Sequence, residues 1–292
     1  MGNAAIVERA DAVSGRLGKI VPGVPHKIGS GFTAYHFSEE MFDGHMDPLL
    51  MVDHFVMTAP TFDPHLHAGI SAVTMMFEDS EGGFLNRDTL GHNITLQPGD
   101  LYWLAAAAGA AHEEKPEDGA RTHALQIFVN LPARLKQQPA RAFHVPANVI
   151  PVIEGDGHRV RVVLGRSGET VGADGTPQEM TMLDGFLDTN GRFSYPLPEG
   201  RQAWIYTVTG RLMLRCQDEE LVLETGNATT VDAGPATTIT LEAGERSHFV
   251  LMAAKPIQEA FVKHGPLVMS TAADVRKTLA NYAEGRFGRI PA

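Results

Sequence analysis

Short runs of apolar residues, separated by turns that contain glycine or proline, recur along the whole chain and restrict its fold more than any other feature. Residues 73–77 and 126–130 alternate with the two-residue period of a half-buried strand, as do residues 160–164 and 203–208. The turns between such runs draw on 30 glycines and 18 prolines among the 292 residues. This pattern predicts an all-β sandwich or barrel.

One helix is expected near the C-terminus. Thr271 and Asp274 form a capping-box pattern, in which the hydroxyl and the carboxylate satisfy free backbone N–H groups at a helix start. An apolar face follows at helical spacing, formed by Val275, Leu279 and Tyr282. Gly285 is the expected stop, and residues 256–264 are a second, shorter candidate helix.

The chain carries a weak internal repeat. Residues 96–100 and 241–245 share a leucine, a glycine three positions later and a following acidic residue, and each precedes an apolar strand. Two β-rich halves of similar size would explain the repeat, although signals this short also arise by chance. A cluster of prolines lies between the halves, so we expect an N-terminal domain over residues 1–145 and a C-terminal domain over residues 146–292.

Charge, cysteine content and hydropathy exclude several classes of protein. The 24 Lys and Arg residues against 35 Asp and Glu residues give a net charge of −11. An acidic surface repels phosphate backbones, so direct nucleic-acid binding is not expected. Cys216 is the single cysteine, which excludes an internal disulfide and a cysteine-based metal cluster. Residues 1–8 show no targeting pattern, and no apolar run approaches the ~20 residues that span a bilayer. We therefore expect a cytoplasmic protein that does not bind membranes.

Two short motifs contain residues that bind metals. On a strand alternate side chains share a face, so His65 and His67 can point to one centre, and His112 and Glu114 can do the same. If the two strands face each other inside a barrel, three imidazoles and one carboxylate converge. That set suits a first-row divalent ion that keeps positions open for substrate or dioxygen. Histidine pairs with this spacing also occur in surface turns, and spacing alone does not separate the two interpretations.

Taken together, these residues resemble the pirin family of the cupin superfamily. Residues 107–116 read AAGAAHEEKP, where the family has a G-R-G-x-x-H-x-E-x-P pattern. The other matching stretches are residues 46–55, 65–67, 98–103, 123–132, 204–206, 247–251 and 264–271. No single stretch is specific, but the combination is, and it covers nearly the whole chain.

The resemblance implies an all-β bicupin, made of two stacked jelly-roll β-sandwich domains with a C-terminal helix. The first domain would hold one divalent metal ion on His65, His67, His112 and Glu114. Fe(II) is the first choice, with Ni, Mn, Co, Cu or Zn as alternatives. The second domain would lack a metal, and residues 193–200 at the corresponding place contain no histidine.

The resemblance also implies a function. Pirin-like proteins are associated with quercetin 2,3-dioxygenase activity, so we expect an oxidoreductase that opens flavonols such as quercetin with dioxygen. Glu114 would be the catalytic base as well as a ligand. The alternative is a non-enzymatic iron-binding pirin that acts as a redox-responsive partner of other proteins or as a transcriptional co-regulator. The expected partners are a flavonol-like aromatic substrate and dioxygen, with a protein partner under the alternative.

Four positions near the site depart from the family pattern. The family's arginine after the second histidine is Ala68, its following Phe and Glu are Ile70 and Ser71, and its second arginine is Ala108. Groups around the ligands orient them and tune the ion, so these changes bear on substrate choice and activity more than on metal binding. The smaller side chains either widen the pocket or mark a cupin without activity.

Overall fold

The structure, a computed structural model, describes residues 15–291. Residues 1–14 and 292 lie outside the described part, and they include the N-terminal stretch searched for a targeting pattern. Nearly all regular elements of the described part are β-strands, as the turn-rich sequence predicts. No helix within residues 15–291 is long and apolar enough to cross a membrane.

The first β-sandwich packs a seven-stranded antiparallel sheet against a four-stranded one. In spatial order the larger sheet contains β12 (Arg141–Val145), β9 (Leu101–Ala105), β6 (Ile70–Met76), β11 (Thr122–Asn130), β4 (Leu49–Met57), β3 (Phe32–Ser38) and β2 (Val24–Ile28). The smaller sheet contains β5 (His65–His67), β10 (Ala110–Pro116), β7 (Phe84–Asp88) and β8 (Asn93–Leu96). Apolar side chains of both sheets meet in one buried cluster, in which Phe84 and Leu96 contact the layer that contains Phe55 and Leu104.

The second β-sandwich repeats this layout. Its seven-stranded sheet contains β1 (Val21–Pro22), β22 (Asn227–Val231), β19 (Gln202–Thr209), β24 (Ser247–Ala254), β17 (Met180–Leu187), β14 (His158–Leu164) and β13 (Val152–Gly155). Its four-stranded sheet contains β18 (Arg192–Leu197), β23 (Thr237–Ala243), β20 (Arg211–Cys216) and β21 (Glu219–Glu224). Buried and exposed residues alternate strictly along β18, with Phe193, Tyr195 and Leu197 turned inward, as expected for a sheet with one solvent-exposed face.

The remaining elements are short, apart from one helix. They are the hairpins β15 (Arg166–Ser167) with β16 (Thr170–Val171) and β25 (Val262–His264) with β26 (Leu267–Met269), the 3-10 turns η1 (Glu39–Phe42) and η2 (Ala147–Val149), and the helices α1 (Ala133–Lys136) and α2 (Ala272–Ala283).

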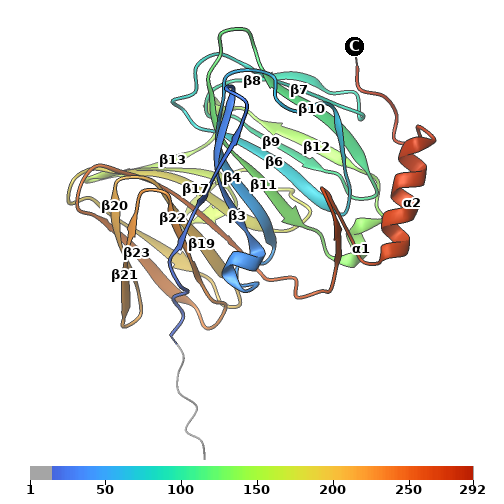
Figure 1. Cartoon of the computed structure of the whole chain (residues 1–292). Helices are drawn as coiled ribbons and strands as arrows, with labels where there is room; N and C mark the ends of the chain where they lie inside the picture. Colours follow the sequence, from blue (N-terminus) through green and yellow to red (C-terminus); the bar gives the residue numbers. More distant parts are fainter. Residues whose placement is uncertain (1–14, 292) are drawn as a thin grey trace, which may run out of the picture.

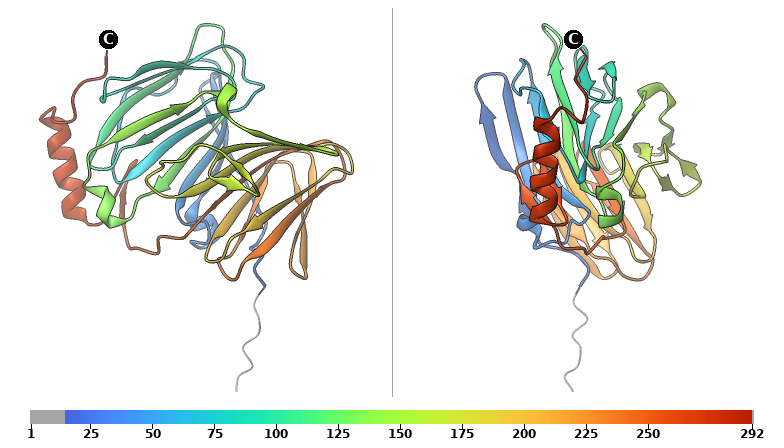
Figure 2. Two further views of the ribbon diagram at one scale, coloured as in Figure 1. Left: turned by 180° about the vertical axis from the view of Figure 1, so that it is seen from behind. Right: turned by 90° about the vertical axis from the view of Figure 1, so that its right-hand side faces the viewer.

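The two sandwiches are stacked through their larger sheets (Figures 1 and 2). One apolar cluster joins them, with Val73 and Leu125 from the first sheet and Met182, Trp204 and Val250 from the second. Strands of these sheets are therefore buried on both faces, which explains why β24 is buried throughout and apolar from residue 249 to residue 254. The bicupin architecture expected from the family resemblance is confirmed. The boundary at residues 145 and 146 stays a prediction.

The two ends of the described chain each pack on the sandwich that is distant in sequence. Near the N-terminus, β1 is an edge strand of the second sandwich, where Val21 pairs with Ala228. Near the C-terminus, β26 and α2 lie alongside the first sandwich (Figures 1 and 2). There Leu267, Met269 and Val275 are buried with residues of the β5 segment. The two halves of the chain therefore depend on each other for complete cores.

The C-terminal helix begins as its capping pattern predicts, since the Thr271 hydroxyl accepts a hydrogen bond from the Asp274 amide at 3.1 Å. Its apolar face was expected to include Leu279 and Tyr282, which are instead 38% and 40% exposed, while Val275 is buried. The prediction of a helix over residues 256–264 is wrong: residues 256–261 are irregular and β25 follows. Long-range contacts keep this stretch out of a helix, including the hydrogen bond from the Gln258 amide to the Asp47 carboxylate at 2.7 Å.

Candidate metal centre

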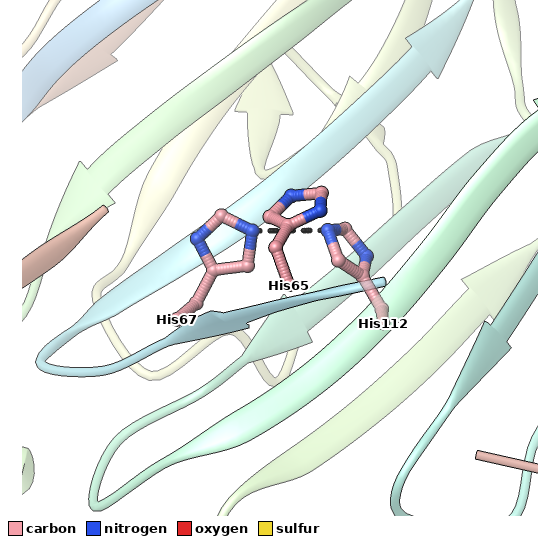
Figure 3. Close-up of side chains that lie close together, drawn as sticks. All are labelled: His65, His67 and His112. Carbon is pink, nitrogen blue, oxygen red and sulfur yellow. Dashed lines mark hydrogen bonds between the residues drawn. The ribbon is translucent and has the colours of Figure 1, made fainter. Parts of the chain in front are cut away.

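Two neighbouring strands bring the predicted histidines together. β5 and β10 are antiparallel, with His65 directly opposite His112 and His67 opposite Ala110. Because side chains alternate along each strand, all three imidazoles point into the sandwich. One nitrogen of each ring lies within 4.8 Å of the others (Figure 3). The predicted convergence of His65, His67 and His112 is therefore present.

Hydrogen bonding indicates which nitrogens are free to bind an ion. The Nδ1 atom of His65 lies 2.8 Å from the carbonyl oxygen of Asp63. A carbonyl only accepts, so Nδ1 carries the hydrogen and Nε2 keeps its lone pair. The Nε2 atoms of His67 and His112 lie 3.0 Å apart, where one can donate a hydrogen bond to the other if it carries the hydrogen (Figure 3). Their Nδ1 atoms are buried, and within residues 15–291 neither has a partner at full hydrogen-bond geometry, although the backbone of Pro266 lies close enough to His67 to oppose the lowering of its pKa.

The donor set fits a divalent ion. Neutral imidazoles carry one hydrogen each, and if both rings keep it on Nδ1, the facing Nε2 atoms of His67 and His112 need a cation between them. Imidazole nitrogens bind such ions at about 2.1 Å, so two nitrogens 3.0 Å apart are close enough for one ion to reach both. Imidazole ligands of this kind suit several first-row metals, so the site does not select one.

Burial keeps these imidazoles in the form that binds metals. Removal from water lowers the pKa of His67 to about 3, and the neighbouring His65 acts in the same direction. Burial also lowers the pKa of His112 well below its ordinary value, with His67 and His65 contributing. His67 and His112 are therefore neutral at physiological pH without any conformational change, and protons compete with a metal for them only in acid.

Glu114 lies beside the histidines and is held by two hydrogen bonds. Its Oε2 atom is 3.9 Å from Nε2 of His112, while Oε1 accepts from Thr74 Oγ1 at 2.5 Å and from Asn86 Nδ2 at 2.8 Å. Burial raises the pKa of Glu114 to about 7, against the opposing effect of these two donors. The structure thus brings Glu114 next to the triad, and its role as a fourth ligand stays a prediction.

A cavity of about 150 Å³ adjoins the candidate ligands His65, His67 and Glu114. Its apolar wall is formed by Phe32, Phe55, Phe62, Phe84 and Phe128, together with Met51 and Met57. Phe62 is 42% exposed and marks the side of the cavity open to solvent. Such a pocket favours a flat aromatic ligand, because ring faces and edges pack against one another.

Two further polar residues line this cavity and were missed by the sequence analysis. Asp53 and Gln126 are direct partners across β4 and β11. One Asp53 oxygen lies 2.6 Å from Nδ1 of His36, and this hydrogen bond is the main cause of the raised pKa of His36. A signal for Asp53 was available: it alternates along β4 with cavity-lining apolar residues at positions 51, 55 and 57. An acidic residue in an otherwise apolar strand face points to a site.

Comparison with known proteins agrees with this architecture. The family model Pirin matches residues 25–129, and the model Pirin C-terminal cupin domain matches residues 182–288. Pirin from Homo sapiens is 30% identical over 247 residues, which cover 83% of each chain. The chain belongs to the pirin family.

Solved structures extend the likeness to nearly the whole pirin chain. Quercetin 2,3-dioxygenase from Acinetobacter baumannii superposes with a TM-score of 0.82 at 26% identity, covering 94% of this chain and 98% of that one. A bacterial pirin from Escherichia coli, solved in complex with nickel(II), gives a TM-score of 0.60 at 18% identity, covering 82% and 100%. The second comparison shows the fold alone.

The four departures from the usual pirin pattern lie outside the cavity wall. Ala68 is fully buried against Leu267 and Met269, and Ile70 packs in another apolar cluster. Neither these two residues nor Ser71 and Ala108 are among the residues that line the cavity. None of these four side chains therefore forms part of the wall of this cavity, and their effect on substrate choice stays a prediction. At Ala68 the small side chain instead lets the C-terminal segment approach.

Proposed function

We propose that this pirin is a metal-dependent dioxygenase that opens flavonols such as quercetin with dioxygen. The observation that carries the proposal is the convergence of three imidazole nitrogens within 4.8 Å at the wall of an aromatic cavity. The likeness to a solved quercetin 2,3-dioxygenase, at 26% identity over 94% of this chain, supports the same activity.

In this proposal His65, His67, His112 and Glu114 hold one divalent ion, with Fe(II) as the first choice. When bound, the ion supplies a Lewis acid that lowers the pKa of a coordinated hydroxyl and a centre for dioxygen chemistry. All other requirements of the reaction fall to the chain's own side chains.

Glu114 is the residue we assign as base. Both hydrogen bonds to its carboxylate end on Oε1, so Oε2 is the atom that would bind the ion and, when released from it, would accept a proton from the flavonol hydroxyl. Its pKa of about 7 lies near the operating pH, which is the range in which a general base is most effective. Thr74 and Asn86 fix the direction in which Oε2 points, and are positioning residues in this scheme.

The cavity wall would orient the substrate and exclude water. The phenylalanine rings offer faces and edges to a flat aromatic ligand. Asp53 adds one hydrogen-bond acceptor beyond the candidate ligands, because only one of its oxygens is used by His36. A ligand hydroxyl that donates to Asp53 would fix the molecule at a second point besides Glu114.

The test is oxygen consumption by full-length protein loaded separately with Fe(II), Ni(II), Mn(II), Co(II) or Cu(II), with and without quercetin. We expect quercetin-dependent oxygen uptake with release of carbon monoxide. Glu114→Gln should lose at least about 100-fold in kcat, within the range that general-base catalysis contributes.

Glu113 provides the matched control. It is the neighbouring acid but bonds to Arg87 and Lys115, on the opposite side of β10. Glu113→Gln should therefore retain wild-type turnover. If no metal supports flavonol-dependent oxygen uptake while the histidines still bind metal, the enzymatic proposal is wrong and the non-enzymatic, redox-responsive alternative takes its place.

A further inference from the structure

The strand that carries two of the histidines is covered from outside by the end of the chain. β5 has three residues and lies at the edge of its sheet. Its inward side chains are His65 and His67, so Leu66 between them, and Ala68 after them, point outward. Both are buried, against Leu267, Met269 and Val275, with Phe287 packed on the same cluster.

Backbone contacts join the same two segments. Ala68 forms a parallel bridge with Leu267, and the Val268 amide donates to the Ala68 carbonyl at 2.9 Å. Gly69 adopts a φ of +73°, and a Cβ atom there would lie only 1.8 Å from the Val268 carbonyl oxygen. The C-terminal hairpin therefore packs against the residues that directly follow His67 with no room for a side chain between them.

A buried lysine ties this contact to the first sandwich. Lys136 is 2% exposed, and its Nζ atom donates to the Gly69 carbonyl at 2.8 Å, the Val268 carbonyl at 2.7 Å and Asn130 Oδ1 at 2.6 Å. All three hydrogens of the ammonium group are used. One side chain thus holds together α1, the end of β11, the turn after β5 and β26.

The approach to the third histidine is covered by the same segment. A Cβ atom on Gly109 would lie 2.4 Å from the ring of Phe287, so this ring rests on the backbone just before β10 and His112. Further on, Arg87 of β7 donates from Nη1 to the Pro291 carbonyl at 3.0 Å. Residues 264–291 therefore pack against the outer side of both strands that carry the candidate ligands.

We propose that residues 264–291 are a positioning element of the metal centre, so that docking of this segment on the first sandwich and binding of a divalent ion by the three histidines strengthen each other. The inference rests on the metal site of the proposed function. Without its cover, β5 would expose Leu66 and lose the contacts that fix the directions of His65 and His67. Linkage makes the effect reciprocal: the factor by which docking raises metal affinity is the factor by which metal favours docking.

The first test compares two variants of the full-length protein by calorimetric titration with Ni(II). Phe287→Ala removes the ring that rests on Gly109, while Leu279→Ala changes a residue of α2 that is 38% exposed. We expect the Kd for Ni(II) to rise about tenfold in Phe287→Ala, as for other groups that orient metal ligands, and to stay at the wild-type value in Leu279→Ala. Equal Kd values for Phe287→Ala and wild type would overturn the proposal.

The second test needs no variant of the C-terminal segment and therefore does not depend on how such a variant folds. Amide hydrogen exchange of α2 is measured with and without Ni(II), in wild type and in His67→Ala. Coupling predicts slower exchange of α2 on Ni(II) addition in wild type and no change in His67→Ala. If wild type binds Ni(II) but the exchange rate of α2 does not change, the proposed coupling is wrong and the proposed function is unaffected. If His67→Ala binds Ni(II) as tightly as wild type, the metal site is elsewhere and the proposed function fails with it.

Discussion

The two sandwiches share one layout and differ in what fills them. In the first, the smaller sheet turns three imidazoles and a carboxylate into the interior, beside a cavity. In the second, the corresponding space is filled by apolar side chains, among them Phe193, Leu212, Leu241 and Phe249. The same arrangement of strands can therefore enclose either a polar site or a packed core.

This difference indicates that the first sandwich holds the candidate site at a cost in stability, while the second is stabilised by its apolar core. Burying imidazoles and a carboxylate opposes folding unless hydrogen bonds or an ion offset the lost hydration. This cost of desolvation appears in the raised pKa of Glu114 and the lowered pKa of His67, both caused chiefly by burial. The second sandwich contains a continuous apolar core, so we expect it to contribute stability that the first does not.

The largest effect should come from damage to the filled interior. Phe249 is fully buried, and Phe249→Ala should lower the free energy of unfolding by about 3–5 kcal/mol, as for other buried aromatic residues. Chemical denaturation measures this loss. Titration of the folded variant with Ni(II) should give the wild-type affinity. A weakened Ni(II) affinity would show that the two interiors are not independent.

Removal of a ligand should weaken metal binding and leave the stability of the metal-free protein unchanged. His67→Ala should weaken Ni(II) binding by more than about 100-fold, which is the upper end of the loss caused by groups that only orient ligands. Metal-free stability should not fall, because the change also removes a buried polar ring. Calorimetry and denaturation of the same sample separate the two quantities. His45→Ala, which changes an exposed histidine bonded to Asp232, serves as the control.

A third effect concerns the contact between the sandwiches. His54 lies 2.6 Å from the Tyr206 hydroxyl of the second sandwich and 2.6 Å from His123. Burial, then the charges of His123 and His248, lower the pKa of His54 from 6.5 to about 3. The folded state thus favours neutral His54, so its contribution to stability is complete above pH 6.5 and is lost as the pH falls toward 3.

At pH 5 that loss amounts to about 2 kcal/mol, since each pKa unit corresponds to about 1.4 kcal/mol. Denaturation curves at several pH values, for wild type and His54→Phe, measure it. The variant keeps a ring but does not titrate, so its stability should fall less steeply below pH 6.5. Identical slopes in the two proteins would contradict the assignment.

The smallest effect concerns whether Glu114 is a ligand of the ion. With a pKa of about 7, Glu114 must lose a proton to bind a cation, so Ni(II) affinity should increase with pH through this range. For one competing proton the Kd at pH 6 should be about tenfold weaker than at pH 8. Glu114→Gln should show a smaller pH dependence than wild type. An equal dependence would remove Glu114 from the ligand set.

Much of the fold could be predicted because its signals are local. Alternation and turn residues indicated strands such as β6 and β19, and the Thr271 cap located the start of α2. The contacts of the termini could not be predicted from these signals, since the bridge between Ala68 and Leu267 joins residues far apart in the sequence. For the same reason Leu279 was placed on the wrong face, because the partner of α2 was unknown.

The candidate site follows the same rule. His65 and His67 share a strand, as do His112 and Glu114, so alternation alone was enough to place each pair on one face. The two strands were expected to face each other across the interior. That they are instead neighbours in one sheet, with His65 opposite His112, emerged only from the structure. Asp53 and Gln126 went unnoticed, because they are adjacent only across two strands of different hairpins.

The crossed termini have a consequence for dissecting the molecule. A protease cut between β12 and β13 would divide the chain into two fragments that should stay associated, because each fragment contributes a segment to the sandwich formed mainly by the other. Expressed alone, the front half would present the bare edge beside Ala68, and the rear half would lack the strand that covers β22. Both halves are therefore needed to cover the edges of both sandwiches.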